Sequence, residues 1–362
     1  MTTPIDPQAR VFAVRMWTSL LATQELLATY LGVRLGLYDD LAAKGPGTVG
    51  EIAARVGVDP RYAREWLEQQ AVAGVLTVDD ASAPADERVF TLPAAHAEVL
   101  TVSDSPLSMS ALAVLPLGGV AAALPALLEA YRSGDGVADA VYGVDWREGH
   151  AGANRAMFTH QMAGWLRRHA PDIHTRLVGT PARVADVACG AGWAGIGLAR
   201  AFPRIAVDGY DIDPEVIADA TGHAADAGLS DRVSFAARDA ADPDLAGTYD
   251  LVCLFDALHE IARPVEVLRA CRRLCADGGS VLVLDARVAE RFAAPADEIE
   301  RFQYATSVLH CLPACRSQQP SAGTGTVLRP DAVRDLAAEA GFAAVTQLPI
   351  DDRFHRLYRL IG

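Results

Sequence analysis

The residues most able to do chemistry in this sequence stand in the stretch FDALHEIARP, which contains Asp256, His259 and Glu260. A neutral imidazole can take a proton from a hydroxyl group, and a nearby carboxylate such as Glu260 or Asp256 can orient it for that role. The same side chain is also a common metal ligand. The stretch therefore predicts a catalytic pair, His259 and Glu260, or a metal ligand at His259. The alternative is a histidine that caps the next helix or fills the core.

A second histidine follows 51 residues later in the stretch LHCLPA, where His310 precedes Cys311. Two histidines that leave other coordination positions open would suit a divalent or ferric metal ion and a bidentate substrate. We therefore treat His259 and His310 as candidate metal ligands, against the alternative that His310 is a packed loop residue.

The six cysteines include two pairs with C-x-x-x-C spacing, Cys271/Cys275 and Cys311/Cys315. Residues four apart lie one turn apart on a helix, so a shared helix face explains the first pair better than a zinc site with four cysteine ligands. We expect all six to be thiols in a reducing cytoplasm.

A glycine-rich stretch, VADVACGAGWAGIGLARAFP, contains the pattern G-x-G-x-x-G from Gly190 through Gly192 to Gly195. This pattern forms a tight turn between a strand and a helix and often binds a dinucleotide, but alone it is a weak signal. The residues around the turn must therefore decide which adenosine compound it holds.

Carboxylates stand in or just after four consecutive expected strands, at Asp186, Asp211, Asp239 and Asp256. In a parallel sheet, ligands bind beyond the carboxyl ends of the strands. A pyrophosphate favours helix-terminal N–H groups and would be repelled by these acids. S-adenosylmethionine carries a sulfonium and an ammonium group and no phosphate, so the acids favour it.

Four segments resemble the class I S-adenosylmethionine-dependent methyltransferases. DVACGAG resembles their D-x-G-x-G-x-G signature, with Ala188 in place of the first glycine, which puts a methyl group near the methionine end of the cofactor. GYDIDPEVIADA is similar to the ribose-binding segment, ARDAAD to the adenine-contacting one and YDLVCLFDALHE to the fourth strand. The resemblance covers residues 183–288 and implies these cofactor-binding residues: Asp186, Gly190, Gly192, Asp211 at the ribose, Asp239 and Ala240 at the adenine, and Asp256.

The layout around His259 is similar to two kinds of relative within this family. In small-molecule O-methyltransferases with a winged-helix N-terminal domain, a histidine at the matching place deprotonates the substrate hydroxyl. In the metal-dependent α-keto acid C-methyltransferases of antibiotic biosynthesis, a metal chelates the keto acid and acidifies its β-carbon. We expect methylation of the β-carbon of an α-keto acid with His259 and His310 as metal ligands. The alternatives are an O-methyltransferase of a phenol or hydroxyl, and a cofactor-binding transcription regulator without catalysis.

The elements that must position these residues alternate between strand and helix, which predicts an α/β Rossmann-like sheet. Strands are expected at residues 183–188, 206–211, 233–238, 249–256 and 280–286, and an antiparallel hairpin at the C-terminal end. A linker and one long helix are expected within residues 141–173. We predict a winged-helix-like dimerisation domain at residues 1–105, a helical linker and cover at 106–175, and a catalytic domain at 176–362 with a substrate insertion at 289–330.

The N-terminal hundred residues predict a helix-turn-helix with a two-stranded wing. Thr48 and Glu51 have capping-box spacing, and Asp59-Pro60 supplies a cap and a proline for the next helix. Such a domain could bind DNA, but residues 1–100 contain 8 Lys and Arg against 13 Asp and Glu. A protein that binds phosphates should be basic here, so we expect no nucleic-acid partner. The apolar helix near residues 16–33 predicts a homodimer instead.

The bulk composition is that of a soluble globular protein: 362 residues, 51% hydrophobic, 22% charged, with a net charge of −14. The net charge argues against wholesale binding to anionic membranes. The start MTTPIDPQAR lacks the features of a signal peptide. The apolar stretch at residues 105–131 is broken by Pro116, Gly118, Gly119 and Pro125, which favours a kinked helical hairpin over a membrane span. We expect a cytoplasmic protein.

Overall fold

The computed structural model describes residues 6–362, which divide into two compact units. One unit runs to Gly119 and includes Glu148–Ala153; the other comprises Val120–Arg147 and Asn154–Gly362. The predicted division at residues 105 and 175 stays a prediction.

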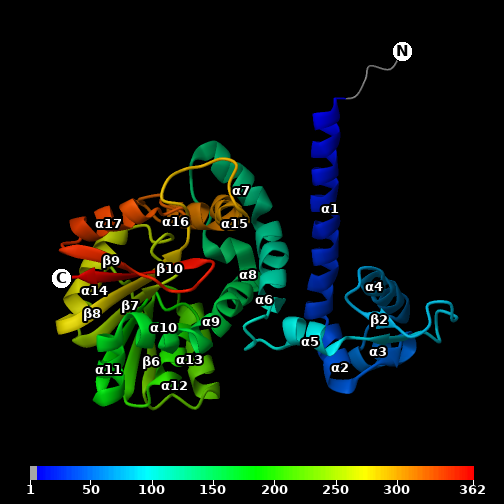
Figure 1. Cartoon of the computed structure of the whole chain (residues 1–362), viewed down its shortest axis with the longest axis horizontal. Coiled ribbons are helices and arrows are strands. Elements are labelled where there is room, and N and C mark those ends of the chain that lie inside the picture. The colour runs from blue at the N-terminus through cyan, green and yellow to red at the C-terminus, as the bar shows by residue number, and fades with distance from the viewer. Residues whose placement is uncertain (1–5) are drawn as a thin grey trace. The chain divides into compact units, whose positions relative to one another are not determined.

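The first unit is a helical domain with a small sheet, as expected (Figure 1). Up to residue 101 its elements are α1 (Pro7–Arg34), α2 (Leu37–Lys44), β1 (Gly47–Thr48), α3 (Val49–Val56), α4 (Pro60–Val72), β2 (Thr77–Val78), β3 (Val89–Thr91) and α5 (Ala94–Thr101). The sheet has the order β1-β3-β2, so β1 adds a third strand to the predicted wing.

The two predicted helix starts of this unit are confirmed. The Thr48 hydroxyl accepts from the backbone N–H of Glu51, whose carboxylate accepts from the N–H of Thr48 at 2.8 Å. Asp59 caps α4 by accepting from the N–H groups of Arg61 and Tyr62 at 2.8 and 3.2 Å. Caps of this kind each stabilise a helix by about 1 kcal/mol.

The predicted hairpin at residues 105–131 is wrong. The chain runs as α6 (Ser110–Val114), a π-helical segment at Leu115–Val120 and α7 (Ala121–Ser133) without reversing. Pro116 lacks an N–H donor and two glycines follow it, and the wider π turn accommodates them within one helical run. By length and composition alone, Ser110–Ser133 is apolar enough to cross a membrane, and one such helix is weak evidence for a membrane span.

The long helix expected within residues 141–173 is also interrupted. The segment contains α8 (Asp139–Ala153), kinked at Gly143, then α9 (Arg155–His160), α10 (Met162–His169) and α11 (Pro171–Gly179). Part of the predicted linker is therefore helical, and no single helix spans the segment.

The second unit is built on a seven-stranded sheet with the order β6-β5-β4-β7-β8-β10-β9. The strands are β4 (Ala182–Val187), β5 (Ile205–Asp211), β6 (Val233–Ala237), β7 (Tyr249–Phe255), β8 (Cys275–Ala286), β9 (Ala344–Leu348) and β10 (His355–Ile361). Strands β4 to β8 are parallel, and β10 is antiparallel to both β8 and β9. The predicted Rossmann-like sheet with a C-terminal hairpin is confirmed. In the sheet, β10 lies between β8 and the edge strand β9 (Figure 1).

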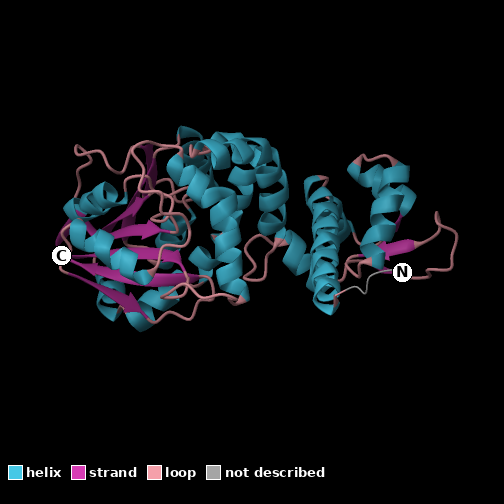
Figure 2. Ribbon diagram, turned by 90° about the horizontal axis from the view of Figure 1, so that it is seen from above, coloured by secondary structure: helices cyan, strands magenta, loops and turns pink. Residues whose placement is uncertain are grey.

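Helices cover both faces of this sheet (Figure 2). One core packs α10, α11 and α12 (Trp193–Ala201) with part of α13 (Pro214–Asp226) against the strands. The other packs α14 (Pro264–Leu274) and α17 (Pro330–Glu339). The insertion before α17 contains α15 (Glu298–Thr306), a π-helical segment at Ser307–Cys311 and α16 (Leu312–Arg316).

Candidate active site

The glycine loop joins β4 to α12 and has a left-handed backbone at three positions. The φ angles are 52° at Ala188, 51° at Gly190 and 80° at Gly192. A Cβ at Gly192 would lie 2.4 Å from the ring of Phe235, whereas a Cβ at Gly190 would meet no atom within 4 Å. Gly192 is therefore required by packing, and Gly190 borders open space on the side where a cofactor is expected. Ala188 adopts a conformation that disfavours any residue with a Cβ.

Asp186 holds the start of α12. Its buried carboxylate accepts from the N–H of Gly195 at 2.9 Å. Burial raises the pKa of Asp186 to about 7. The structure thus gives Asp186 a role inside the loop, and its contact with a cofactor stays a prediction.

Asp211 ends β5 and connects that strand to the glycine loop. Its carboxylate accepts from the N–H groups of Gly190 at 2.9 Å and Asp213 at 3.1 Å. Burial raises the pKa of Asp211. Because β4 and β5 are parallel neighbours, the loop and this carboxylate meet at the same edge of the sheet.

Asp239 and Ala240 follow β6, the neighbour of β5. The Asp239 carboxylate accepts from the N–H of Ala241 at 2.8 Å and forms an ion pair with Arg263. The loop, Asp211 and the segment after β6 therefore stand at the carboxyl ends of three adjacent strands, in the order that the resemblance implies for methionine, ribose and adenine.

Replacing Asp211 by alanine should weaken S-adenosylmethionine binding at least about tenfold. The change removes the expected ribose acceptor, and a hydrogen bond to a charged group contributes about 1.5–3 kcal/mol. The same change removes two hydrogen bonds that shape the loop. Titration calorimetry measures the affinity, with Asp208→Ala, on the same strand, as the control. Unchanged affinity in folded protein would remove Asp211 from the site.

Asp256 follows β7 and is the second non-glycine residue with a positive φ, at 53°. Its carboxylate accepts from the side-chain amide of Asn154 and lies 3.6 Å from Nε2 of His355. Burial would lower the pKa of His355, but Asp256 and Asp352 raise it to about 10. Asp256 was one of two residues expected to orient His259; its carboxylate contacts Asn154 and His355.

His259 is buried in the turn after β7, and a carboxylate that sequence reasoning missed orients it. Its Nδ1 lies 2.9 Å from Oδ1 of Asp285 in β8, and its backbone N–H donates to Oδ2 at 3.2 Å. Burial would lower the pKa of His259, but the charge and hydrogen bond of Asp285 raise it well above the usual value. An acid inside the apolar stretch SVLVLDA was the available signal.

Glu260 lies between the two candidate histidines. Its Oε1 is 3.5 Å from Nε2 of His259 and 3.3 Å from Nδ1 of His310. Burial would raise the pKa of Glu260, but the two imidazoles hold it well below the usual value. The two histidines predicted as metal ligands, His259 and His310, thus both lie close to one carboxylate oxygen of Glu260.

His310 is buried within the π-helical segment, and Asp139 and Trp146 contact its ring. Its Nε2 lies 2.8 Å from Oδ1 of Asp139, and its ring stacks on Trp146 with 3.8 Å between centroids. Burial would lower the pKa of His310, but Glu260 raises it well above the usual value. The residue is packed, as in the alternative reading, but it lies in a helical segment and not in a loop. Its role as a metal ligand stays a prediction.

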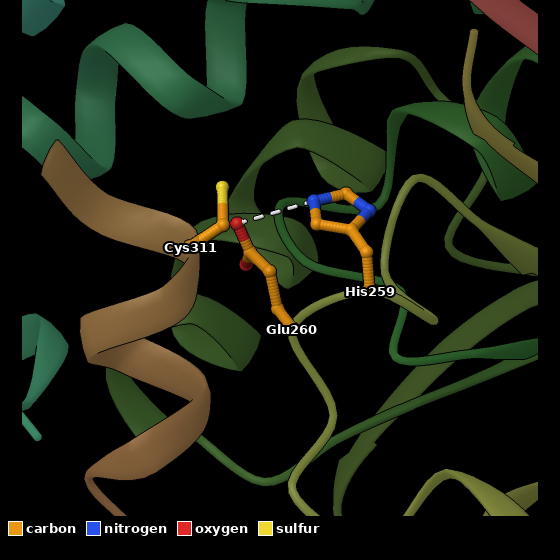
Figure 3. A group of neighbouring side chains, drawn as sticks. All are labelled: His259, Glu260 and Cys311. Carbon is orange, nitrogen blue, oxygen red and sulfur yellow. Dashed lines mark ion pairs between the residues drawn. The ribbon is translucent and has the colours of Figure 1, made fainter. Parts of the chain in front are cut away.

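Cys311 completes a group that can hold a metal ion. The ligand atoms of His259, Glu260 and Cys311 lie within 4.8 Å of one another (Figure 3). His310, one of the two predicted ligands, lies outside this three-membered group and contacts it through Glu260.

All six cysteines are free thiols. Cys271 lies in α14, whereas Cys275 begins β8, so the expected shared helix face does not extend to Cys275.

Two family models match this chain, each over part of it. Residues 185–281 match a methyltransferase domain, and residues 22–102 match the Rv2258c-like winged HTH domain. The first range holds the glycine loop, the strand-end acids and His259.

Curated proteins of known activity also match part of this chain. The ubiquinone biosynthesis O-methyltransferase of Burkholderia orbicola is 30% identical over 118 residues, which are 33% of this chain and 47% of that protein. The chain thus spans about half the length of the curated relatives it matches.

Solved structures match over the whole chain. Human N-acetylserotonin methyltransferase, solved in complex with S-adenosylmethionine, has a TM-score of 0.73 at 19% identity and full coverage of both chains. The mitomycin 7-O-methyltransferase MmcR has a TM-score of 0.70 at 20% identity, covering 98% of this chain and 99% of that one. At such identities the likeness shows the fold. The chain therefore contains a methyltransferase domain and a winged helix-turn-helix domain, and it has the fold of the solved S-adenosylmethionine-dependent methyltransferases.

Proposed function

We propose that this protein methylates a small molecule of specialised metabolism, and that the acceptor is the β-carbon of an α-keto acid. In this proposal a divalent or ferric metal ion is held by His259, Glu260 and His310. The observation that carries it is the meeting of one nitrogen from each histidine on the same oxygen of Glu260.

The outer sides of both imidazoles support a metal site. A histidine that ligates a metal usually gives its other ring N–H to a carboxylate, which fixes the tautomer and the ring orientation. Asp285 takes this place at Nδ1 of His259, and Asp139 takes it at Nε2 of His310. Nε2 of His259 and Nδ1 of His310 are therefore the nitrogens left to face Glu260.

The chain's own residues orient the site and exclude water. Thr324 donates to the backbone carbonyl of His259 at 2.7 Å, which restrains the turn. Tyr142 and Trp146 pack against the His310 ring and cover it. A metal ion bound here supplies Lewis acidity toward a chelating keto acid. The glycine loop and Asp211 are expected to place the methyl donor S-adenosylmethionine at the same edge of the sheet.

Removal of the metal should abolish methylation of an α-keto acid, and added divalent ions should restore it. A metal ion that chelates the keto acid polarises its carbonyl and acidifies the β-carbon, so methylation of this carbon should depend on the metal. The experiment treats the purified protein with a chelator, dialyses it, and offers a keto-acid panel and a phenol panel with S-[methyl-¹³C]adenosylmethionine. Carbon NMR of the product shows whether the label is on the β-carbon. Full activity in metal-free protein would contradict the proposal.

The second candidate is an O-methyltransferase of a phenol or hydroxyl group with His259 as general base. The hydrogen bond from Nδ1 to Asp285 favours it, because it orients the ring and leaves Nε2 to take a proton. In that case chelators have no effect and the label is found on oxygen. The two activities are therefore separated by one experiment.

A cofactor-binding regulator without turnover is the alternative from another class, and the charges of α4 speak against it. Arg61 forms an ion pair with Glu65 and Arg64 with Glu68, which leaves the helix without excess positive charge. We propose a cytoplasmic homodimer joined through the N-terminal domain, with no nucleic-acid or membrane partner.

A further inference from the structure

We infer that Cys311 is a thiolate ligand of the metal ion held beside His259 and Glu260, so that this site selects a thiolate-binding divalent ion such as Zn²⁺ or Co²⁺ over Mg²⁺. The inference rests on the proposed metal site and adds a ligand and a metal class to it.

The local helix geometry places two consecutive side chains in one cluster. His310 and Cys311 close the π-helical segment Ser307–Cys311, and both are buried, with 1% and 3% of their surfaces exposed. Single π turns inside α-helices recur at functional sites, because they re-aim side chains that an α-helix would direct elsewhere. Here the turn directs an imidazole and a thiol at the same neighbours.

The thiol contacts the metal-binding side of the cluster. Its sulfur lies within 4.8 Å of the ligand atoms of His259 and Glu260 (Figure 3). The sulfur, the Glu260 carboxylate and one nitrogen of His259 are therefore three donors that can meet at one ion.

The neighbouring cysteine has a different environment and serves as a control. Cys315 is also buried, but its sulfur contacts the carbonyl of Ile261 and the hydroxyls of Ser321 and Thr324 at 3.4–3.7 Å. The sulfur of Cys315 is thus hydrogen-bonded to backbone and hydroxyl oxygens, so a serine at this position should leave the metal site unchanged.

The donor set decides the metal class. Mg²⁺ and Ca²⁺ take oxygen ligands. A site with thiolate, imidazole and carboxylate suits Zn²⁺ and its spectroscopic substitute Co²⁺. Zn²⁺ also tolerates a change from four to five ligands, which allows a chelating acceptor to bind.

The test is a Co²⁺ titration of the full-length, metal-stripped protein followed by absorption spectroscopy. The wild type should show visible d–d bands and a near-ultraviolet sulfur-to-cobalt charge-transfer band. Cys311→Ser should lose the charge-transfer band and bind Co²⁺ more weakly. Loss of a residue that only hydrogen-bonds to a metal ligand lowers metal affinity about 10–100-fold, and loss of the ligand itself should cost at least as much. Cys315→Ser should keep both.

The outcomes separate this inference from the proposed function. If the wild type shows cobalt d–d bands without a charge-transfer band, Cys311 is not a ligand, and the proposed metal site at the two histidines is still supported. Absence of any cobalt binding would overturn both. The wild-type spectrum decides even if Cys311→Ser does not fold, and Mg²⁺ in large excess should not displace the cobalt.

Discussion

Alanine at His259 or at His310 should each remove the metal ion and lower turnover of an α-keto acid by more than about 100-fold. The loss of an outer partner of a metal ligand costs about 10–100-fold in affinity or activity, and loss of a ligand costs more. S-adenosylmethionine should still bind, because the glycine loop and Asp211 are the residues expected to hold it. The measurements are metal content by mass spectrometry, cofactor affinity by calorimetry, and turnover.

Two further variants sharpen this prediction. Asp285→Asn keeps His259 but changes the partner of its Nδ1, and a loss within the 10–100-fold range is expected. His174→Ala is the control, because this histidine packs on Phe202 in another part of the unit. A different outcome would favour the second candidate. If His259→Ala is inactive, His310→Ala retains turnover and metal has no effect, the protein is an O-methyltransferase with His259 as the general base.

A charge placed on the apolar surface of α1 should dissociate the expected homodimer. Large apolar side chains are exposed along this helix, among them Phe12, Trp17 and Leu20 at 59%, 64% and 50%. A buried aromatic anchor in an interface contributes about 2 kcal/mol or more, or about 30-fold in the dissociation constant. Light scattering should give twice the 38.3 kDa chain mass for the wild type and a shift toward one chain for Trp17→Glu.

The control for this experiment lies on α4. Tyr62 is 80% exposed and outside α1, so Tyr62→Glu should leave the mass unchanged. A monomeric wild type would contradict the prediction. Salt-sensitive binding to random duplex DNA would count against the N-terminal domain as a dimerisation module.

The parallel part of the sheet could be predicted from the sequence because its central strands, β4, β7 and β8, are largely buried on both faces. Such strands are continuous apolar runs, and each ends at a polar or glycine residue. The cap at Thr48 was predictable for another reason, since it rests on a contact with Glu51, three residues away.

The partners around the histidines depend on contacts between distant segments and were missed. Asp285 comes from β8, and Asp139 is 171 residues from His310. No local pattern pairs such residues. The helical run through Pro116 was missed because a π turn needs packing that sequence periodicity does not report.

The position of β10 between β8 and β9 sets an order of assembly. β9 precedes β10 in the chain, yet its ladder is formed with β10 alone among the described strands. During synthesis, β4 to β8 can pair as they emerge, whereas β9 must wait for a later segment. Loss of the residues from His355 onward would therefore leave β9 without a ladder and expose the hydrogen-bonding edge of β8, a template for aggregation. Nascent chains stalled before this point are expected to depend on chaperones.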